Sequence, residues 1–208
     1  ENSPWNLLSQ SVQAVAFQEH PYHWPVIGYE DDMKNWKQAD CERYFKTYYA
    51  PNNCVVVVSG NVKFADVKRM AEKYLEPIPA QPAYAPVHIT EPAQTGEKRI
   101  MVQKEVAPYL HIVYHVQKTK NEDYYALDIL SSVLSAGNSS RLYSSLVDKK
   151  QLATQVFTNY SESFDPTLFK LYAVTNKGVN ETDLEKAIYE EIEKIKKDGI
   201  SERELQKI

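Results

Sequence analysis

The sequence predicts an α+β fold in which mixed, mainly antiparallel sheets pack against helices. Several stretches repeat apolar residues at helical spacing, and the short runs between them are either apolar throughout or alternate apolar with polar residues. Two of the alternating runs are separated by Asp165 and Pro166, a turn signal typical of a hairpin. With 43% hydrophobic residues among 208, the chain has enough apolar side chains to build a core.

The first part of the chain predicts three helices. Ser3 as N-cap and Pro4 in the first turn begin a helix that runs to about Gln18. Apolar residues recur at helical spacing over residues 38–49 and again over residues 64–75. The first of these two stretches carries aromatic side chains on one face, which we expect to pack in a core.

Strands and a linker are predicted around these helices. Residues 53–59 form a short run that is apolar on both faces, so we expect a central strand covered on both sides. Prolines crowd residues 76–97, a composition typical of a stiffened linker. Beyond the linker, residues 99–105 and 109–117 have the pattern of two further strands.

The last part of the chain combines helices with a hairpin. The predicted helices cover residues 122–134, 139–150 and 181–197, and the predicted hairpin joins residues 154–160 to residues 167–175. We expect Gly137 to terminate the first of these helices. A capping box from Ser201 to Glu204 begins one more helix.

Charge and hydropathy exclude two classes of partner. The chain has 24 Lys and Arg against 28 Asp and Glu, a net charge of −4, and no basic run that would favour binding to nucleic acid. The longest uninterrupted apolar run, Val55 to Val58, is far shorter than the roughly 20 residues of a membrane helix. We therefore expect neither a nucleic-acid partner nor a membrane span. Cys41 and Cys54 form no metal or redox motif, and we expect both to be buried thiols.

Two pairs of histidines are candidate metal ligands. His111 and His115 have the i, i+4 spacing of a helical zinc site, but the residues around them alternate as in a strand. Four residues of a strand span about 13 Å, which is too far for two side chains to share one ion. His20 and His23 lie in a Pro-rich turn without a third ligand at a recognisable spacing, so we expect them to pack within that turn.

No other motif predicts a self-contained active site. The carboxylates lie in loops or on polar helix faces, where contact with solvent accounts for their presence without a catalytic role. Nucleophile-elbow, phosphate-binding and dinucleotide-binding glycine motifs are missing from the sequence. We therefore assign no catalytic, cofactor-binding or metal-binding residue to this segment.

Six short motifs occur in an order and spacing that resembles one family. They are Glu-Asn-Ser-Pro-Trp at residues 1–5, the His-Pro-Tyr-His turn at residues 20–28, Tyr-Tyr-Ala-Pro-Asn-Asn at 48–53, Ser-Gly-Asn-Val at 59–62, Glu-Pro-Ile-Pro at 76–79 and Ala-Gly-Asn-Ser-Ser-Arg-Leu at 136–142. Together they resemble the M16 zinc metallopeptidases, the family of pitrilysin, insulinase and mitochondrial processing peptidase. The similar region is the one that follows the catalytic motif, often called the C-terminal or inactive domain.

The resemblance implies a division of the chain. Residues 1–80 would be the latter part of the first M16 lobe, residues 81–97 the Pro-rich linker, and residues 98–208 the first part of the second lobe. The family's zinc motif, His-x-x-Glu-His, is not in this chain. The segment would therefore hold no cofactor, and the zinc of the parent protein would be bound upstream of Glu1. Glu1 matches a later glutamate of the family, and only in a shifted alignment would it match the third zinc ligand.

Two positions depart from the pattern of many second lobes. Val147 stands where such lobes carry an arginine, and Thr154 stands where they carry a tyrosine. That arginine and tyrosine orient the substrate backbone in the family. The resemblance thus implies that an Arg/Tyr pair comes from another lobe or a partner subunit.

The sequence therefore predicts a non-catalytic segment of an M16-type zinc metalloendopeptidase, which shapes the peptide-degradation chamber and supports the zinc lobe of the same chain. The substrate would be a peptide or an unfolded protein, and the segment alone would be inactive. Two alternatives stay open: a structural, core-protein-like M16 homologue without protease activity, and a stand-alone peptide-binding module. A homodimer is a further expectation. The compartment is open; a bacterial parent would lie in the periplasm or cell envelope, or in the cytoplasm.

Overall fold

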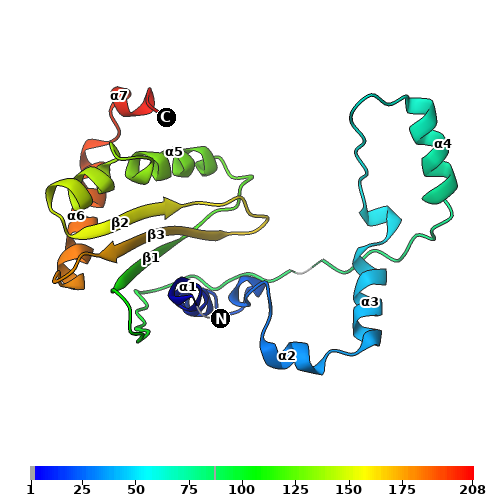
Figure 1. Cartoon of the computed structure of the whole chain (residues 1–208), viewed down its shortest axis with the longest axis horizontal. Helices are drawn as coiled ribbons and strands as arrows, with labels where there is room; N and C mark the ends of the chain where they lie inside the picture. The colour runs from blue at the N-terminus through cyan, green and yellow to red at the C-terminus, as the bar shows by residue number, and fades with distance from the viewer. Residues whose placement is uncertain (1–2, 87) are drawn as a thin grey trace. The chain divides into compact units, whose positions relative to one another are not determined.

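The computed structural model describes residues 3–86 and 88–208, which form two compact units (Figure 1). Unit 1 combines the described residues up to Trp24 with residues 91–208, and unit 2 consists of residues 25–90. Chain segments that are far apart in sequence therefore build unit 1 together.

The ranges that the resemblance implies for two lobes and a linker, 1–80, 81–97 and 98–208, do not coincide with these two units. Their assignment to lobes stays a prediction.

An antiparallel sheet of three strands forms the centre of unit 1. β1 (Tyr109–Val116) and β2 (Ala153–Asn159) both pair with β3 (Thr167–Thr175), which lies between them. The register places His111 of β1 opposite Tyr172 of β3. Because directly opposed residues point to the same side of a sheet, these two rings share one face.

Helices pack on both faces of the sheet (Figure 1). The main core lies between one face and three helical segments, α5 (Asp123–Ser135), the π-helix η3 (Tyr143–Lys149) and α6 (Glu181–Asp198). Its most deeply buried members are Leu142, Leu146, Leu171, Leu184 and Ile188. The other face carries α1 (Pro4–Ala16), whose C-terminal end packs with Phe17 and Leu168 in a smaller cluster.

Most of the elements predicted for unit 1 are confirmed. The structure contains the predicted N-terminal helix as α1, the hairpin as β2 and β3, and the helix over residues 181–197 as α6. α7 (Glu202–Leu205) begins with the predicted capping box, and Gly137 follows α5 with a φ of 75°, in the left-handed region that favours glycine. The helix predicted over residues 139–150 is present and is a π-helix over most of its length.

One strand predicted in unit 1 is wrong. Residues 99–105 form no regular element, and most of them are exposed. None of the three described strands pairs with this segment, because the sheet contains only β1, β3 and β2. Arg99 instead turns its side chain to α6, where it donates two hydrogen bonds to Glu185 at 2.9 and 2.7 Å.

Unit 2 is helical. It contains α2 (Glu30–Asn35), α3 (Gln38–Tyr48) and α4 (Phe64–Tyr74), with a short 3₁₀ helix, η2 (Pro51–Asn53), after α3. α3 and α4 match the two predicted helices. α2 was not among the predicted helices; three acidic residues in its first turn complement the helix dipole.

The central strand predicted over residues 53–59 is wrong. Val55 and Val57 are 89% and 84% exposed, and the segment from Cys54 to Val58 has no regular structure. A strand is held by backbone hydrogen bonds to a neighbour, and unit 2 supplies none among its described residues. Cys54 lies in this exposed segment and Cys41 on an open surface of α3, so the prediction that both thiols are buried is also wrong.

The structure describes most of the Pro-rich segment, and its assignment as a linker stays a prediction. Its described residues between 76 and 97 form neither helix nor strand.

Over the described part of the chain, no helix is both long and apolar enough to cross a membrane.

Candidate functional site

His111 and His115 lie on β1, as the alternating sequence pattern predicts, and each has its own surroundings. The His111 ring stacks on Tyr172 with 4.0 Å between ring centroids, and both of its ring nitrogens are buried without a hydrogen-bond partner among the described residues. Burial lowers the pKa of His111 to about 4, and the positive charge of Lys170 acts in the same direction. The imidazole is therefore neutral at neutral pH.

His115 serves the neighbouring helix. Its Nε2 lies 3.2 Å from the carbonyl oxygen of Ala16, at the C-terminal end of α1, where it can donate a hydrogen bond. Because this ring binds a backbone carbonyl while His111 is buried under an aromatic ring, the two side chains do not converge on one ion. Within residues 3–86 and 88–208, no group of three or more His, Cys, Asp or Glu side chains could hold a metal.

His20 and His23 organise the turn that their prolines predict, which contains the 3₁₀ helix η1 (Pro21–His23). Nδ1 of the buried His20 accepts a hydrogen bond from the Tyr22 backbone at 3.1 Å, and its Nε2 lies 3.6 Å from Asp165. His23 Nδ1 lies 2.8 Å from the carbonyl oxygen of Phe17. Each ring is thus engaged in fixing the turn.

Glu1, the other residue considered as a ligand, lies outside the described residues.

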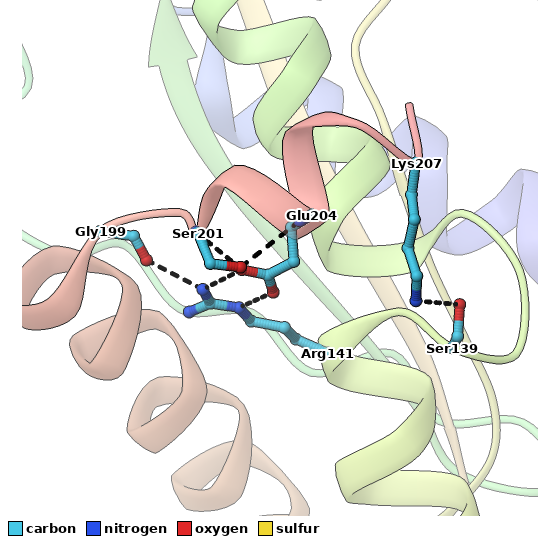
Figure 2. Close-up of polar contacts among 6 residues, drawn as sticks. All are labelled: Ser139, Arg141, Gly199, Ser201, Glu204 and Lys207. Carbon is cyan, nitrogen blue, oxygen red and sulfur yellow. Dashed lines mark hydrogen bonds and ion pairs between the residues drawn. The ribbon is translucent and has the colours of Figure 1, made fainter.

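The Ser-Arg-Leu motif forms a polar cluster with the C-terminal helix (Figure 2). Arg141 donates two hydrogen bonds to the Glu204 carboxylate at 2.6 and 2.8 Å and a third to the carbonyl oxygen of Gly199 at 2.9 Å. Glu204 also accepts hydrogen bonds from the backbone N–H and the hydroxyl of Ser201 at 2.9 and 2.7 Å. A bidentate pair of this kind is directional as well as strong.

This cluster attaches α7 to unit 1. Side-chain hydrogen bonds from Arg141 and then from Ser201 hold the pKa of Glu204 well below its usual range, so the pair stays charged at neutral pH. The side chains of Arg141 and Glu204 are only 20% and 27% exposed, which limits competition from water. Lys207 adds a contact from Nζ to the Ser139 hydroxyl at 3.3 Å (Figure 2). The motif therefore has a structural role in this chain.

Arg141→Met is expected to release α7 while leaving the sheet folded, because it removes three charge-assisted hydrogen bonds and leaves the Glu204 carboxylate unpaired. The local free energy of opening should fall by about 1–3 kcal/mol. Hydrogen exchange at the α7 amides measures this loss. Arg203→Met is the matched control, since Arg203 is exposed and makes no ion pair with any described residue. Equal exchange rates in the two variants would contradict this role of Arg141.

Unit 2 has an open apolar hollow of about 1090 Å³. Its lining comes from residues 25–28, from the end of α2 and from α3, and it includes Val26, Ile27, Trp36, Tyr44, Phe45 and Tyr48. The aromatic face of α3 was expected to pack in a core. That expectation is wrong, because Tyr44 and Phe45 are 60% and 62% exposed.

Most of the chain matches the model of a known protein family. The family model described as the peptidase M16 inactive domain matches residues 35–208, most of the chain. The chain belongs to the peptidase M16 inactive-domain family. Its α+β architecture and its M16 resemblance, both predicted from the sequence, are thereby confirmed.

Several relatives of this M16 inactive domain are zinc proteases by name. The chain is 35% identical to the zinc protease PqqE of Helicobacter pylori over 212 aligned residues, which cover 100% of this chain and 48% of that protein. It is 28% identical to the mitochondrial-processing peptidase subunit beta of Blastocladiella emersonii, with 83% of this chain and 38% of that protein covered. The M16 inactive domain described here thus spans about half the length of the curated relatives that it matches.

Solved structures show the same architecture. A protease from Helicobacter pylori superposes with a TM-score of 0.88 at 36% identity, covering 99% of this chain and 51% of that chain. A peptidase M16 inactive domain from Pseudomonas fluorescens superposes with a TM-score of 0.78 at 18% identity, covering 99% of this chain and 50% of that chain. The second likeness supports the fold alone.

Val147 and Thr154, the two positions that we expect to depart from the family pattern, make packing and backbone contacts. Val147 lies in the π-helix and packs against the main core of unit 1. Thr154 lies in β2, with its hydroxyl 3.5 Å from the carbonyl oxygen of Val174. Neither side chain can donate the charged or phenolic hydrogen bond that an arginine or a tyrosine supplies.

Sequence reasoning missed the partners of this domain's polar contacts. Glu204 was recognised as part of a capping box, while its pairing with Arg141, 63 residues away, has no local signal. Glu91 was not singled out, although its carboxylate binds backbone N–H groups more than 70 residues earlier. Covariation between these positions in an alignment is the signal that would reveal such pairs.

Proposed function

We propose that this chain is a non-catalytic segment of an M16-type zinc metalloendopeptidase, in which it shapes the peptide-degradation chamber and supports the zinc-bearing lobe. The observation that carries this proposal is the match of the whole chain, at 35% identity, to about half of a zinc protease. The family model for the M16 inactive domain over residues 35–208 supports the same reading. The other half of such a parent would supply the chemistry.

The residues of this chain do not fit the zinc ion that the family implies. A zinc ligand needs a ring nitrogen free to point at the ion, together with further ligands that converge on it. Both nitrogens of His111 are buried beside Tyr172, and His20 is engaged by a backbone N–H and by Asp165. We therefore place the zinc of the parent in its other half, upstream of Glu1. A peptide or unfolded protein is the proposed substrate class.

The partner lobes are part of the same proposal. With Val147 and Thr154 at the two departing positions, an Arg/Tyr pair that orients the substrate backbone would come from another lobe or from a partner subunit. Residues 1–80 would support the zinc lobe of the same polypeptide, and residues 98–208 would contribute to the wall of the chamber.

Deleting residues 98–208 from the parent protein tests the proposal, because it removes the proposed chamber wall and keeps the residues proposed to support the zinc lobe. The deletion is expected to leave one zinc bound in the remaining part and to lower kcat/KM for peptide cleavage by about tenfold or more, because a chamber wall that positions substrate is lost. Metal analysis after dialysis and peptide kinetics measure the two effects separately. An unchanged kcat/KM would contradict the proposal, and a parent without zinc would favour the core-protein-like alternative.

The isolated chain provides the second arm of this test. It is expected to hold no stoichiometric zinc after dialysis and to cleave no peptide, because its histidines do not converge. One tightly bound zinc per chain, lost in His111→Ala or in His20→Ala, would overturn the assignment of zinc to the other half of the parent.

A further inference from the structure

The chain crosses between the two units at two places. Within unit 1, one carboxylate joins the segments next to these two crossings. It leaves unit 1 after Trp24 and returns at Glu91. The Glu91 carboxylate accepts three hydrogen bonds from the backbone just before the first crossing. They come from the N–H groups of Gln18 at 2.6 Å, of Glu19 at 3.0 Å and of His20 at 2.9 Å. The first residue of unit 1 after the return is thus bonded to the segment of unit 1 that precedes the first crossing.

The backbone that Glu91 binds is also held from its carbonyl side. The contacts run from Lys98 Nζ to the Val15 carbonyl oxygen at 3.0 Å, from His115 Nε2 to that of Ala16 at 3.2 Å and from His23 Nδ1 to that of Phe17 at 2.8 Å. Basic side chains are favourable at these carbonyls because the C-terminal end of a helix carries a partial negative charge. The N–H groups that follow have no helical acceptor, and a carboxylate is the acceptor that suits them.

These contacts make the hydrogen bonds of Glu91 stronger than those of an ordinary surface glutamate. Burial alone would raise the pKa of Glu91, but the hydrogen bonds from the backbone N–H groups of residues 18–20 outweigh it, and the positive potential of His115 adds to them, so the pKa lies below its usual value. The carboxylate is therefore ionised at neutral pH and the three bonds are charge-assisted. Removing it would leave three neighbouring N–H groups without a protein acceptor.

We propose that Glu91 is a clasp that ties together the two crossings of the chain and thereby limits how far unit 2 moves with respect to unit 1. With the clasp closed, Trp24 and Glu91 leave unit 1 from one fixed base. With the clasp open, the crossings lose the three bonds nearest to unit 2, and the contact of Lys98 with the Val15 carbonyl oxygen, farther from both crossings, holds them less closely. The clasp acts whatever activity the parent protein has, so its test is separate from that of the proposed function.

Spin-label distances measure the freedom of unit 2. One label is placed on Cys41, which is exposed in unit 2, after Cys54→Ser, and the second on Lys177→Cys, an exposed position in unit 1. The distance distribution between the labels is expected to become about twofold wider in Glu91→Ala than in the parent chain. Amide exchange at residues 18–20 should accelerate by about ten- to a hundredfold, since charge-assisted bonds are lost.

Two further variants make the result decisive. Glu91→Gln keeps the shape of the side chain but has a single oxygen acceptor, so it should widen the distribution less than Glu91→Ala does. Glu105→Ala is the matched control, because Glu105 is exposed and makes no hydrogen bond with any described residue, and it should change neither measurement. If Glu91→Ala fails to fold, Glu91→Gln alone carries the test. An unchanged distance distribution alongside accelerated exchange at residues 18–20 would overturn the proposal.

Discussion

Leu171→Ala is expected to lower the free energy of unfolding of unit 1 by about 3–5 kcal/mol, the upper part of the range for buried leucines. Leu171 is fully buried at the centre of the middle strand, where it packs in the main core with Leu142, Leu146 and Ile188. Removing its branched end leaves a cavity that a strand bonded on both sides cannot close.

Hydrogen exchange of the β3 amides under increasing urea reports this loss, because the middle strand opens only when unit 1 unfolds. Val57→Ala is the matched control, since Val57 is 84% exposed in unit 2. It should change stability by no more than about 0.5 kcal/mol. Equal effects of the two substitutions would contradict the placement of the core in unit 1.

The contrast between Leu171 and Val57 also shows what the sequence could predict. Both residues lie in runs that have the pattern of a strand, which alternates around Leu171 and is apolar on both faces around Val57. The hairpin that contains Leu171 carries its own turn signal at Asp165, so its partner strand is close in sequence and the prediction is correct. The run around Val57 depends on a partner that no described residue supplies, and a local pattern cannot say whether a distant partner is present.

Helices were predicted well because their signals are local. The capping box at Ser201 and the glycine after α5 each act within a few residues of the helix end that they define. The polar contacts that attach these elements are not local. Arg141 binds Glu204 and Glu91 binds residues 18–20 through spacings that have no periodic signal, so they become visible only in the fold.

His111 combines the two cases. Its alternation with apolar neighbours placed it correctly on a strand. The i, i+4 spacing of His111 and His115 therefore did not predict a zinc site, because that spacing brings two ligands together only on a helix. Nothing local indicated that the ring would be buried against Tyr172 with both nitrogens unpaired. That burial has a measurable consequence for stability.

Unit 1 is expected to lose stability at His111 as the pH falls from about 6.5 towards 4. The pKa of His111 in the folded state is lowered to about 4 from its usual 6.5, first by burial and then by Lys170. Between these two values the unfolded chain binds a proton that the folded chain does not, so stability falls with falling pH. Each pKa unit corresponds to about 1.4 kcal/mol, which gives a loss of up to about 3 kcal/mol across the window.

His111→Phe isolates this contribution, because phenylalanine keeps an aromatic ring against Tyr172 and has nothing to protonate. The variant should be close to or above the parent chain in stability at pH 7.5, since two unpaired buried nitrogens are removed. Its advantage should then grow as the pH is lowered and level off below about pH 4, where both forms of the parent chain are protonated. His88→Phe is the control, because His88 is exposed in unit 2 and should show no such dependence in unit 1. A stability difference between His111→Phe and the parent chain that stays constant from pH 7.5 to pH 4 would show that this imidazole is solvated, and the stacked, buried placement of His111 would then be wrong.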